Sequence, residues 1–240
     1  DFSKRILTRI FSNGRFDHGG RFYRAWWHNV PSEYRKYITI DGKRTCEYDY
    51  SQLNPHMVYF LRGAKMGDED AYDRVFDGEH RDIVKEAFNA MIQASTNLTQ
   101  KPRKLDLSEV DLDWPTLKQA ILDAHKPIAD LFFQGHGNHL QFIDSCIAEN
   151  VMLNFIRAED ASVLPVHDSF IMHYAYGELG ELEEEMRRSF HGHFKKDINV
   201  KSEIGVMLPS SFDGKEWSDL TFEEQIHGPP EYSQWEDRNS

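Results

Sequence analysis

Two aspartates stand at the ends of β-prone segments that lie far apart in the chain. Asp49 follows residues 45–48, and Asp168 follows residues 163–167. Carboxylates are ligands that Mg²⁺ prefers, and paired carboxylates can hold two such ions. If the two segments are neighbours in one sheet, the sequence predicts a two-metal centre able to transfer a nucleotidyl group. Each aspartate taken alone also suits a helix cap or a tight turn.

Polar side chains recur every four residues in a segment with helical periodicity. The four positions are Arg81, Lys85, Asn89 and Gln93. On a helix they lie on one face, along about 18 Å. Two cations followed by two amides suit a triphosphate at one end and a sugar or base at the other. An ordinary solvated helix surface is the alternative interpretation of the same pattern.

A third group of residues precedes Asp49. Gly19 and Gly20 stand before Arg21, and Asn29 follows a short distance later. The paired glycines allow a close approach of the backbone and leave the guanidinium able to bind a phosphate or a base edge.

The charge of the chain is unevenly distributed. The net charge is −12 over 240 residues, but the first 45 residues carry ten Lys or Arg and only four Asp or Glu. The overall charge argues against a nucleic-acid partner, whereas the basic N-terminal segment suits a local phosphate site. A solvated basic face explains that segment equally well.

The composition predicts a soluble cytoplasmic protein without a membrane partner. The two cysteines, Cys46 and Cys146, form no disulfide framework, which fits a reduced compartment. No apolar run approaches the ~18 residues of a membrane helix. The first residues lack the apolar segment of a signal peptide.

Periodicity and turn signals predict the elements that must position these residues. We expect hairpins at 37–50, turning at Asp41 and Gly42, and at 162–175, turning near Asp168. Helices are expected at 55–61, 79–95, from Trp114 towards Phe133, at 139–158 and at 178–196. A strand should follow near 198–206, and from 208 the chain is polar and rich in turn formers.

The order and spacing of these segments resemble the palm and fingers of A-family (polymerase-I-like) DNA polymerases and the related single-subunit phage-type RNA polymerases. Residues 20–21 and 29–31 are similar to that family's Thr-Gly-Arg and Asn-Ile-Pro elements. Residues 49–53 (Asp-Tyr-Ser-Gln-Leu) resemble its motif A, Arg81 with Lys85 its motif B, and residues 166–170 (Val-His-Asp-Ser-Phe) its motif C. The likeness covers roughly residues 19–206.

The resemblance implies an α+β fold in which an antiparallel palm sheet carries both aspartates and a helical fingers subdomain is inserted. The implied parts are the N-terminal palm at 1–61, the fingers at 62–140, the C-terminal palm at 141–207 and a tail at 208–240. Few residues precede Gly19, so the resemblance leaves the thumb or a processivity function to a partner protein.

The same resemblance implies a template-directed DNA polymerase of DNA replication, which extends a primer on a nucleic-acid template with nucleoside triphosphates. Asp49, Asp168 and the Tyr50 carbonyl would hold two Mg²⁺ ions, which Mn²⁺ could replace. Lys85 would be catalytic at the triphosphate. Contacts to the substrates, including supports of the two aspartates, would come from Arg21, Asn29, Gln52, Asn54, Arg81, Asn89, Gln93 and His167.

Two positions depart from the family pattern. Asn54 stands where a sugar-excluding Glu is usual, and Gln93 replaces a stacking Tyr. These changes predict weak discrimination between sugars. Two alternatives therefore stay open: an RNA polymerase or primase-like enzyme, and an inactive polymerase-like domain that binds nucleic acid.

Overall fold

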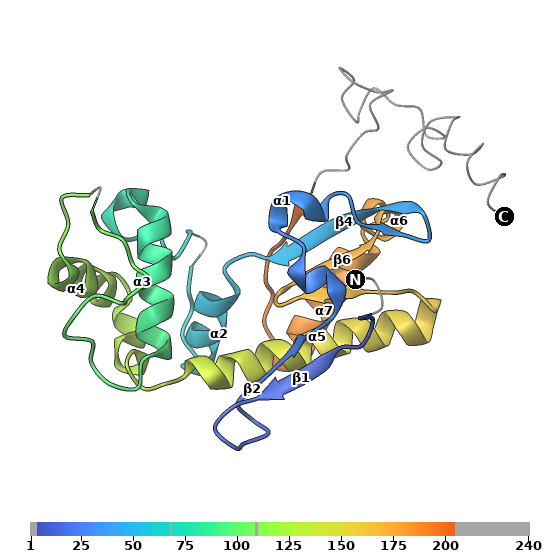
Figure 1. Cartoon of the computed structure of the whole chain (residues 1–240). Helices are drawn as coiled ribbons and strands as arrows, with labels where there is room; N and C mark the ends of the chain where they lie inside the picture. The colour runs from blue at the N-terminus through green and yellow to red at the C-terminus, as the bar shows by residue number, and fades with distance from the viewer. Residues whose placement is uncertain (1–3, 68, 109, 205–240) are drawn as a thin grey trace.

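The computed structural model describes residues 4–67, 69–108 and 110–204, and it confirms the predicted mixture of helices with an antiparallel sheet. A sheet lies on one side and a cluster of helices on the other, with α2 between them (Figure 1). The long helix α5 (Gly137–Glu159) runs beneath the sheet and reaches the helical cluster. The predicted tail from 208 lies outside the described residues.

The central sheet has the strand order β3-β4-β6-β5, and β7 pairs with β4 as well. Every pairing is antiparallel. Side chains alternate between its two faces: Cys46 and Tyr50 belong to the main hydrophobic core, whereas Glu47 points the other way, towards Arg35. The strands are β3 (Thr39–Ile40), β4 (Lys43–Tyr50), β5 (Leu164–Val166), β6 (Ser169–His173) and β7 (Val200–Ile204).

Both predicted hairpins are confirmed. Ile40 pairs with Lys43 across a turn in which Asp41 and Gly42 have φ values of 53° and 72°. Positive φ at both central residues is the geometry that Asp-Gly favours in two-residue hairpins. The second hairpin pairs Val166 with Ser169, so residues 167–168 form its turn.

The predicted helices are present, with one difference at the helix that starts at Trp114. It ends at Ala124 and gives way to a 3-10 helix, η3 (Lys126–Leu131), instead of running towards Phe133. Pro127 explains the break, because proline disfavours α conformation in the residue before it and removes a backbone donor. The α-helices are α1 (Ser32–Arg35), α2 (Leu53–Leu61), α3 (Arg81–Gln93), α4 (Trp114–Ala124), α5, α6 (Tyr174–Glu178) and α7 (Glu181–Phe194); two further 3-10 helices are η1 (Trp26–Asn29) and η2 (Phe76–Gly78).

None of the helices within the described residues combines the length and the apolar character needed to cross a membrane.

A hairpin that the sequence patterns did not predict joins β1 (Thr8–Phe11) to β2 (Gly19–Tyr23) and packs on α5. Arg9 connects them: its guanidinium donates to the Gly20 carbonyl (2.9 Å) and the Ser145 hydroxyl (2.7 Å) and pairs with Glu149 (2.9 Å). Gly20 has φ +84°, and a Cβ there would lie 2.9 Å from the Phe11 ring and 3.1 Å from the Ser145 hydroxyl of α5. Glycine therefore permits the contact between the hairpin and the helix.

The helical cluster encloses a polar group in its core. His125 is fully buried after α4, its Nδ1 lies 3.0 Å from the Tyr59 hydroxyl, and its ring meets the Phe88 ring edge to face. Arg74 donates to the same hydroxyl at 3.3 Å. Burial, together with the positive charge of Arg74, lowers the pKa of His125 to about 4. The imidazole is therefore neutral in the folded protein at pH 7.

We predict that the buried imidazole makes the fold acid-sensitive. Because the pKa of His125 is lower in the folded chain than in the unfolded chain, its contribution to stability is lost as the pH falls from about 6.5 to 4. The loss should reach about 3 kcal/mol. Urea unfolding of the wild type and of His125→Leu at several pH values in this range measures how steeply the free energy of unfolding depends on pH in each protein. His80→Asn, at an exposed position with positive φ, should keep the wild-type slope; equal slopes for His125→Leu and wild type would refute the prediction.

Candidate active site

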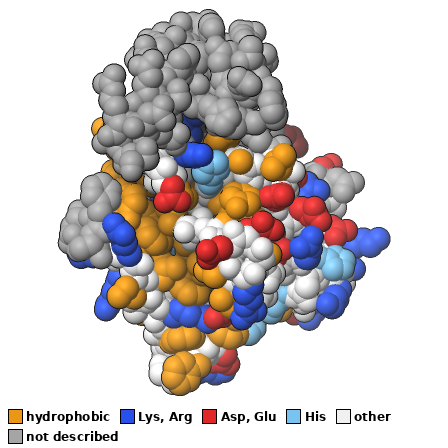
Figure 2. Space-filling view, turned by 90° about the vertical axis from the view of Figure 1, so that its right-hand side faces the viewer, with side chains coloured by type: hydrophobic (Ala, Val, Ile, Leu, Met, Phe, Trp, Pro, Cys, Tyr) orange, Lys and Arg blue, Asp and Glu red, His pale blue; other side chains and the backbone are white. Residues whose placement is uncertain are grey.

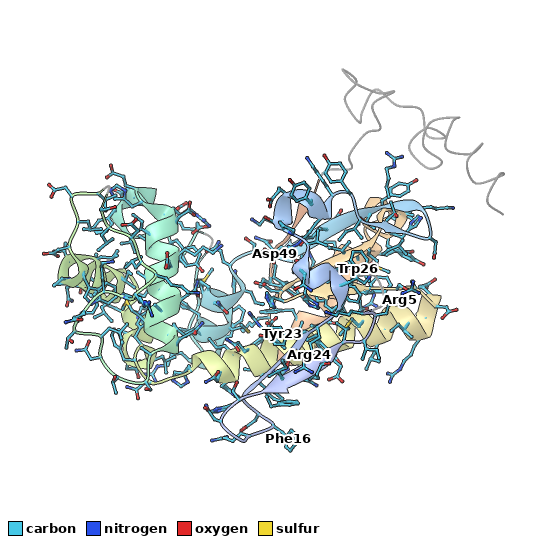
Figure 3. All side chains as sticks on the ribbon, viewed as in Figure 1. Arg5, Phe16, Tyr23, Arg24, Trp26 and Asp49 are labelled. Atoms are coloured by element: carbon cyan, nitrogen blue, oxygen red, sulfur yellow. The ribbon has the colours of Figure 1, made fainter. Side chains whose placement is uncertain are left out.

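The strand register brings the two predicted aspartates together. Asp49, near the end of β4, is directly paired with Ser169 of β6, and Asp168 is the turn residue immediately before Ser169. Residues paired in this way have Cβ atoms about 5 Å apart. Figure 3 shows Asp49 at the end of the sheet that faces the helical cluster. The two carboxylates therefore share one end of the sheet.

Arg21 reaches the same region from β2 and pairs with a carboxylate that lies deep in the protein. Its Nε donates to Oδ2 of Asp144 at 2.6 Å, and the Asp144 side chain is only 2% exposed. Burial would lower the pKa of Arg21, but the charges of Asp144 and Asp168 outweigh this effect and raise it. The primer-contacting residue suggested by the resemblance is thus held by a partner on α5.

The environment of Asp144 raises the pKa of its carboxyl group but leaves that group paired with Arg21. Burial raises the pKa of this carboxyl group, and the negative charge of Asp168 raises it further, whereas Arg21 opposes both effects. Arg21 is consequently shared between two carboxylates. It neutralises Asp144 directly and lies within electrostatic range of Asp168.

The polar ladder on α3 has two different ends. Arg81 pairs with Asp70 at 2.7 Å and with Asp73 at 3.4 Å, and its guanidinium stacks on the Tyr72 ring. Lys85, one turn later, is exposed. Arg81 therefore anchors the loop before α3, and Lys85 is the ladder's accessible cation.

The amide end of the ladder meets α2. Asn54 donates to Asn89 across 2.9 Å, which links α2 to α3. The buried Tyr72 hydroxyl also hydrogen-bonds Asn89, and burial raises the pKa of this tyrosine. Gln93 lies at the end of α3 against the start of α5, where a Cβ on Gly137 would lie 2.5 Å from its Cγ.

Gln52 and His167, expected to support the aspartates, have other contacts. The Gln52 side chain accepts a hydrogen bond from the Ala71 backbone N–H at 2.6 Å. It therefore holds the loop that carries Tyr72. His167 is exposed in the hairpin turn with φ +60°, and its ring meets the Tyr23 ring edge to face at 5.7 Å.

A groove of about 830 Å³ lies beside the turn formed by residues 167–168 and combines cations with rings. Its cations are Lys4, Arg24 and Arg35, and its rings are Tyr23, His28 and His167. The predicted substrate residue Asn29 lines it too. Cations beside stackable rings are what a nucleic-acid strand requires. Tyr23 and Arg24 lie close together below Asp49 in Figure 3.

A second groove, of about 890 Å³, has a different character. It is lined by the exposed rings of Tyr34 and Tyr37, by Trp26 and by Ile156. Figure 2, which views the molecule from the end opposite the helical cluster, shows hydrophobic side chains over a broad part of that face. This groove does not include either aspartate.

The donor set at the sheet end fits Mg²⁺ better than Zn²⁺. It consists of two aspartates, and no three His, Cys, Asp or Glu residues are grouped for metal binding in the described parts of the chain. Mg²⁺ is commonly bound through one or two carboxylates together with substrate phosphates, whereas Zn²⁺ sites take three or four protein ligands. The Tyr50 side chain is turned into the core, where its hydroxyl donates to the Met186 carbonyl at 2.6 Å, so only its backbone carbonyl could contribute.

Three residues at the site were missed by the sequence patterns: Glu47, Tyr72 and Asp144. Glu47 precedes Asp49 by two residues, so strand alternation could have placed it on the same face. Nothing in the local sequence marks Asp144 or Tyr72, because their roles come from partners distant in the chain, namely Arg21 and Asn89.

We predict that breaking the buried pair is costly and that removing both partners is less so. Arg21→Met should lower the free energy of unfolding at pH 7 by about 2–3 kcal/mol, and adding Asp144→Leu should recover at least half of the loss. Since the pKa of Asp144 is already raised, the defect of Arg21→Met should shrink as the pH falls and the carboxyl takes up a proton. Urea unfolding at pH 5 to 8 measures this. Arg15→Met, in an exposed pair with Asp17, is the control that should leave stability unchanged; a defect in Arg21→Met that does not change with pH would contradict the prediction.

Comparison with solved structures finds a polymerase. The protein is similar to the structure described as the POL domain of Pol1 from M. smegmatis in complex with DNA primer-template and dNTP, with a TM-score of 0.51 and 14% sequence identity. The match covers 82% of this chain and 46% of that chain, so this chain spans less than half of its structural neighbour. No family model matches the sequence, and no curated protein matches it. The similarity shows a polymerase-like fold.

Proposed function

We propose that this protein is a template-directed nucleotidyltransferase that extends a primer 3′-OH. One observation carries the proposal: in a polymerase-like fold, the pairing of Asp49 with Ser169 sets Asp49 beside Asp168 at an accessible end of the sheet. The M. smegmatis structure is described as a complex with primer-template and dNTP. A similar substrate pair for this chain is part of the proposal.

The two aspartates would hold Mg²⁺, with the Tyr50 carbonyl as a further oxygen ligand. Bound there, the metal would supply Lewis-acid stabilisation to the attacking hydroxyl and the departing pyrophosphate. The contribution of the chain is to fix the carboxylates. Asp49 is held in the middle of the sheet, between β6 and β7, and Asp168 is held by a two-residue turn.

Two groups of cations near the aspartates would bind different phosphates, those of the nucleotide and those of the nucleic-acid backbone. Lys85 is exposed on α3 and would bind the triphosphate, where its charge would offset negative charge that develops in the transition state. Arg81 would act with it by orienting the start of α3 through Asp70. The groove containing Lys4 and Arg24 adjoins the turn formed by residues 167–168 and would bind the nucleic-acid backbone.

A second candidate, an RNA polymerase or primase-like enzyme, is favoured by the amides at the sugar end of the site. Asn54 and Asn89 are hydrogen-bonded to each other, and both remain partly accessible. An amide can donate to or accept from a ribose 2′-OH. The choice between the two candidates is therefore a question of sugar selectivity.

The first functional prediction concerns the aspartates. Asp49→Asn and Asp168→Asn should each reduce primer extension by about 10³-fold or more, equivalent to about 4 kcal/mol of transition-state stabilisation, because metal affinity requires both charges. Circular dichroism should show an unchanged fold. Asp130→Asn, at an exposed site in η3, is the control and should retain full activity. Near-normal extension by either aspartate variant in Mg²⁺ would exclude the mechanism, whereas absence of extension by the wild type would favour the non-catalytic binding domain.

The second functional prediction concerns the sugar. The site should prefer dNTPs over rNTPs by no more than about 10²-fold, because it tolerates an added hydroxyl without a dedicated gate. Asn54→Glu should increase the preference for dNTPs by adding bulk, and Asn54→Gln separates the effect of length from that of charge. Competition between the two nucleotide sets on one primer-template measures both. A wild-type preference of about 10⁴-fold or more would contradict the prediction.

A further inference from the structure

A buried ion pair lies two residues before Asp49 on β4 and is not used in the mechanism above. Glu47 of β4 is 4% exposed, and its Oε1 accepts from Arg35 Nη1 at 3.0 Å. The hydroxyl of Ser169 donates to the same oxygen at 2.5 Å. One carboxylate oxygen thus joins the end of α1 to β6.

The pair is placed directly beside the catalytic residues. Glu47 precedes Asp49 by two residues on one strand, so both side chains lie on the same face of the sheet. Ser169 is the strand partner of Asp49 and follows Asp168 in the chain. The network therefore contacts the residue that sits between the two aspartates.

Stability alone gives a poor reason for a charged pair at this position. Taking two ions out of water costs several kcal/mol each, and apolar residues of similar size often replace a buried ion pair without loss. The neighbours on this face include the buried apolar side chains of Ile38 and Ile171, so an apolar solution was available. The charges of Glu47 and Arg35 instead lie close to Asp49, where they would affect the affinity for a cation.

Resting on the proposed function, we propose that Glu47 and Arg35 are a charge-balanced pair that keeps uncompensated positive charge away from the divalent-cation site. Through Ser169 the pair fixes the β5–β6 turn that carries Asp168 relative to Asp49. Its two charges also cancel, so the field at the aspartates is set by the aspartates themselves. Glu47 acts through Arg35 and Ser169, which both bind its Oε1, and within the described part of the chain it is not grouped with the two aspartates as a third metal ligand.

The pair makes a prediction that a purely structural role does not. Glu47→Gln keeps the shape and the acceptor oxygen but leaves Arg35 uncompensated, and the added positive charge should weaken Mn²⁺ binding by about threefold to tenfold. Adding Arg35→Met removes that charge and should restore affinity to within about twofold of the wild type. Arg35→Met alone should not weaken binding, since it adds no positive charge.

The experiment measures metal binding directly in the full chain, without nucleotide or nucleic acid. Electron paramagnetic resonance reports free Mn²⁺ during titration, and calorimetry with Mg²⁺ provides a second measurement. Thr45→Val is the matched control: Thr45 is buried on the same face of β4 and donates to the Ile38 carbonyl at 2.7 Å, but it carries no charge. Its melting temperature should fall while its Mn²⁺ affinity stays that of the wild type.

The outcomes separate this inference from the proposed function. Asp49→Asn and Asp168→Asn should abolish Mn²⁺ binding; if they do not, the metal site itself is misplaced and the proposed function fails. If they do, but Glu47→Gln binds Mn²⁺ within twofold of the wild type, the charge balance of the pair has no role at the cation site. A double variant that binds no better than Glu47→Gln would likewise overturn the inference, because lost packing and not charge would then explain the defect.

Discussion

The antiparallel register between β4 and β6 is the constraint on which the rest of the site depends. It pairs Asp49 with Ser169 and so fixes Asp168 at the adjoining turn. Because side chains alternate along a strand, a slip of one residue would send Asp49 to the core face and expose Tyr50. Tyr50 is buried there and donates to Met186 of α7, and this anchor opposes such a slip. The hydrophobic core and the candidate active site therefore specify the same register.

Charges near the aspartates are balanced in pairs, each formed between elements distant in sequence. Arg21 of β2 neutralises Asp144 of α5, and Arg35 of α1 neutralises Glu47 of β4. Each pair attaches a peripheral element to the centre of the molecule while contributing no net charge. The basic N-terminal segment thus has two uses: some of its cations hold the fold together, and others, such as Lys4 and Arg24, line the groove.

The helical cluster is connected to the segment after Asp49 by two polar contacts. Gln52 holds the backbone of Ala71, and Asn54 binds Asn89 on α3. Both contacts begin within five residues of Asp49. A movement of α3 would therefore displace the segment next to Asp49. This coupling gives α3, which carries the exposed Lys85, a defined position relative to Asp49.

The sequence by itself determined the elements and the candidate chemistry, because strand alternation, helical periodicity and Asp-Gly turns are local signals. It anticipated both hairpins around the aspartates and the helix that carries Lys85, but it missed the β1–β2 hairpin, whose glycines are poor strand formers. Only the tertiary structure decided which charges meet. Arg21 with Asp144, Arg35 with Glu47, and Arg81 with Asp70 are separated by 123, 12 and 11 residues. Such pairs form because the elements pack together and because burying an unpaired charge is costly. Both effects depend on contacts between separate segments, so no single segment of the sequence predicts them.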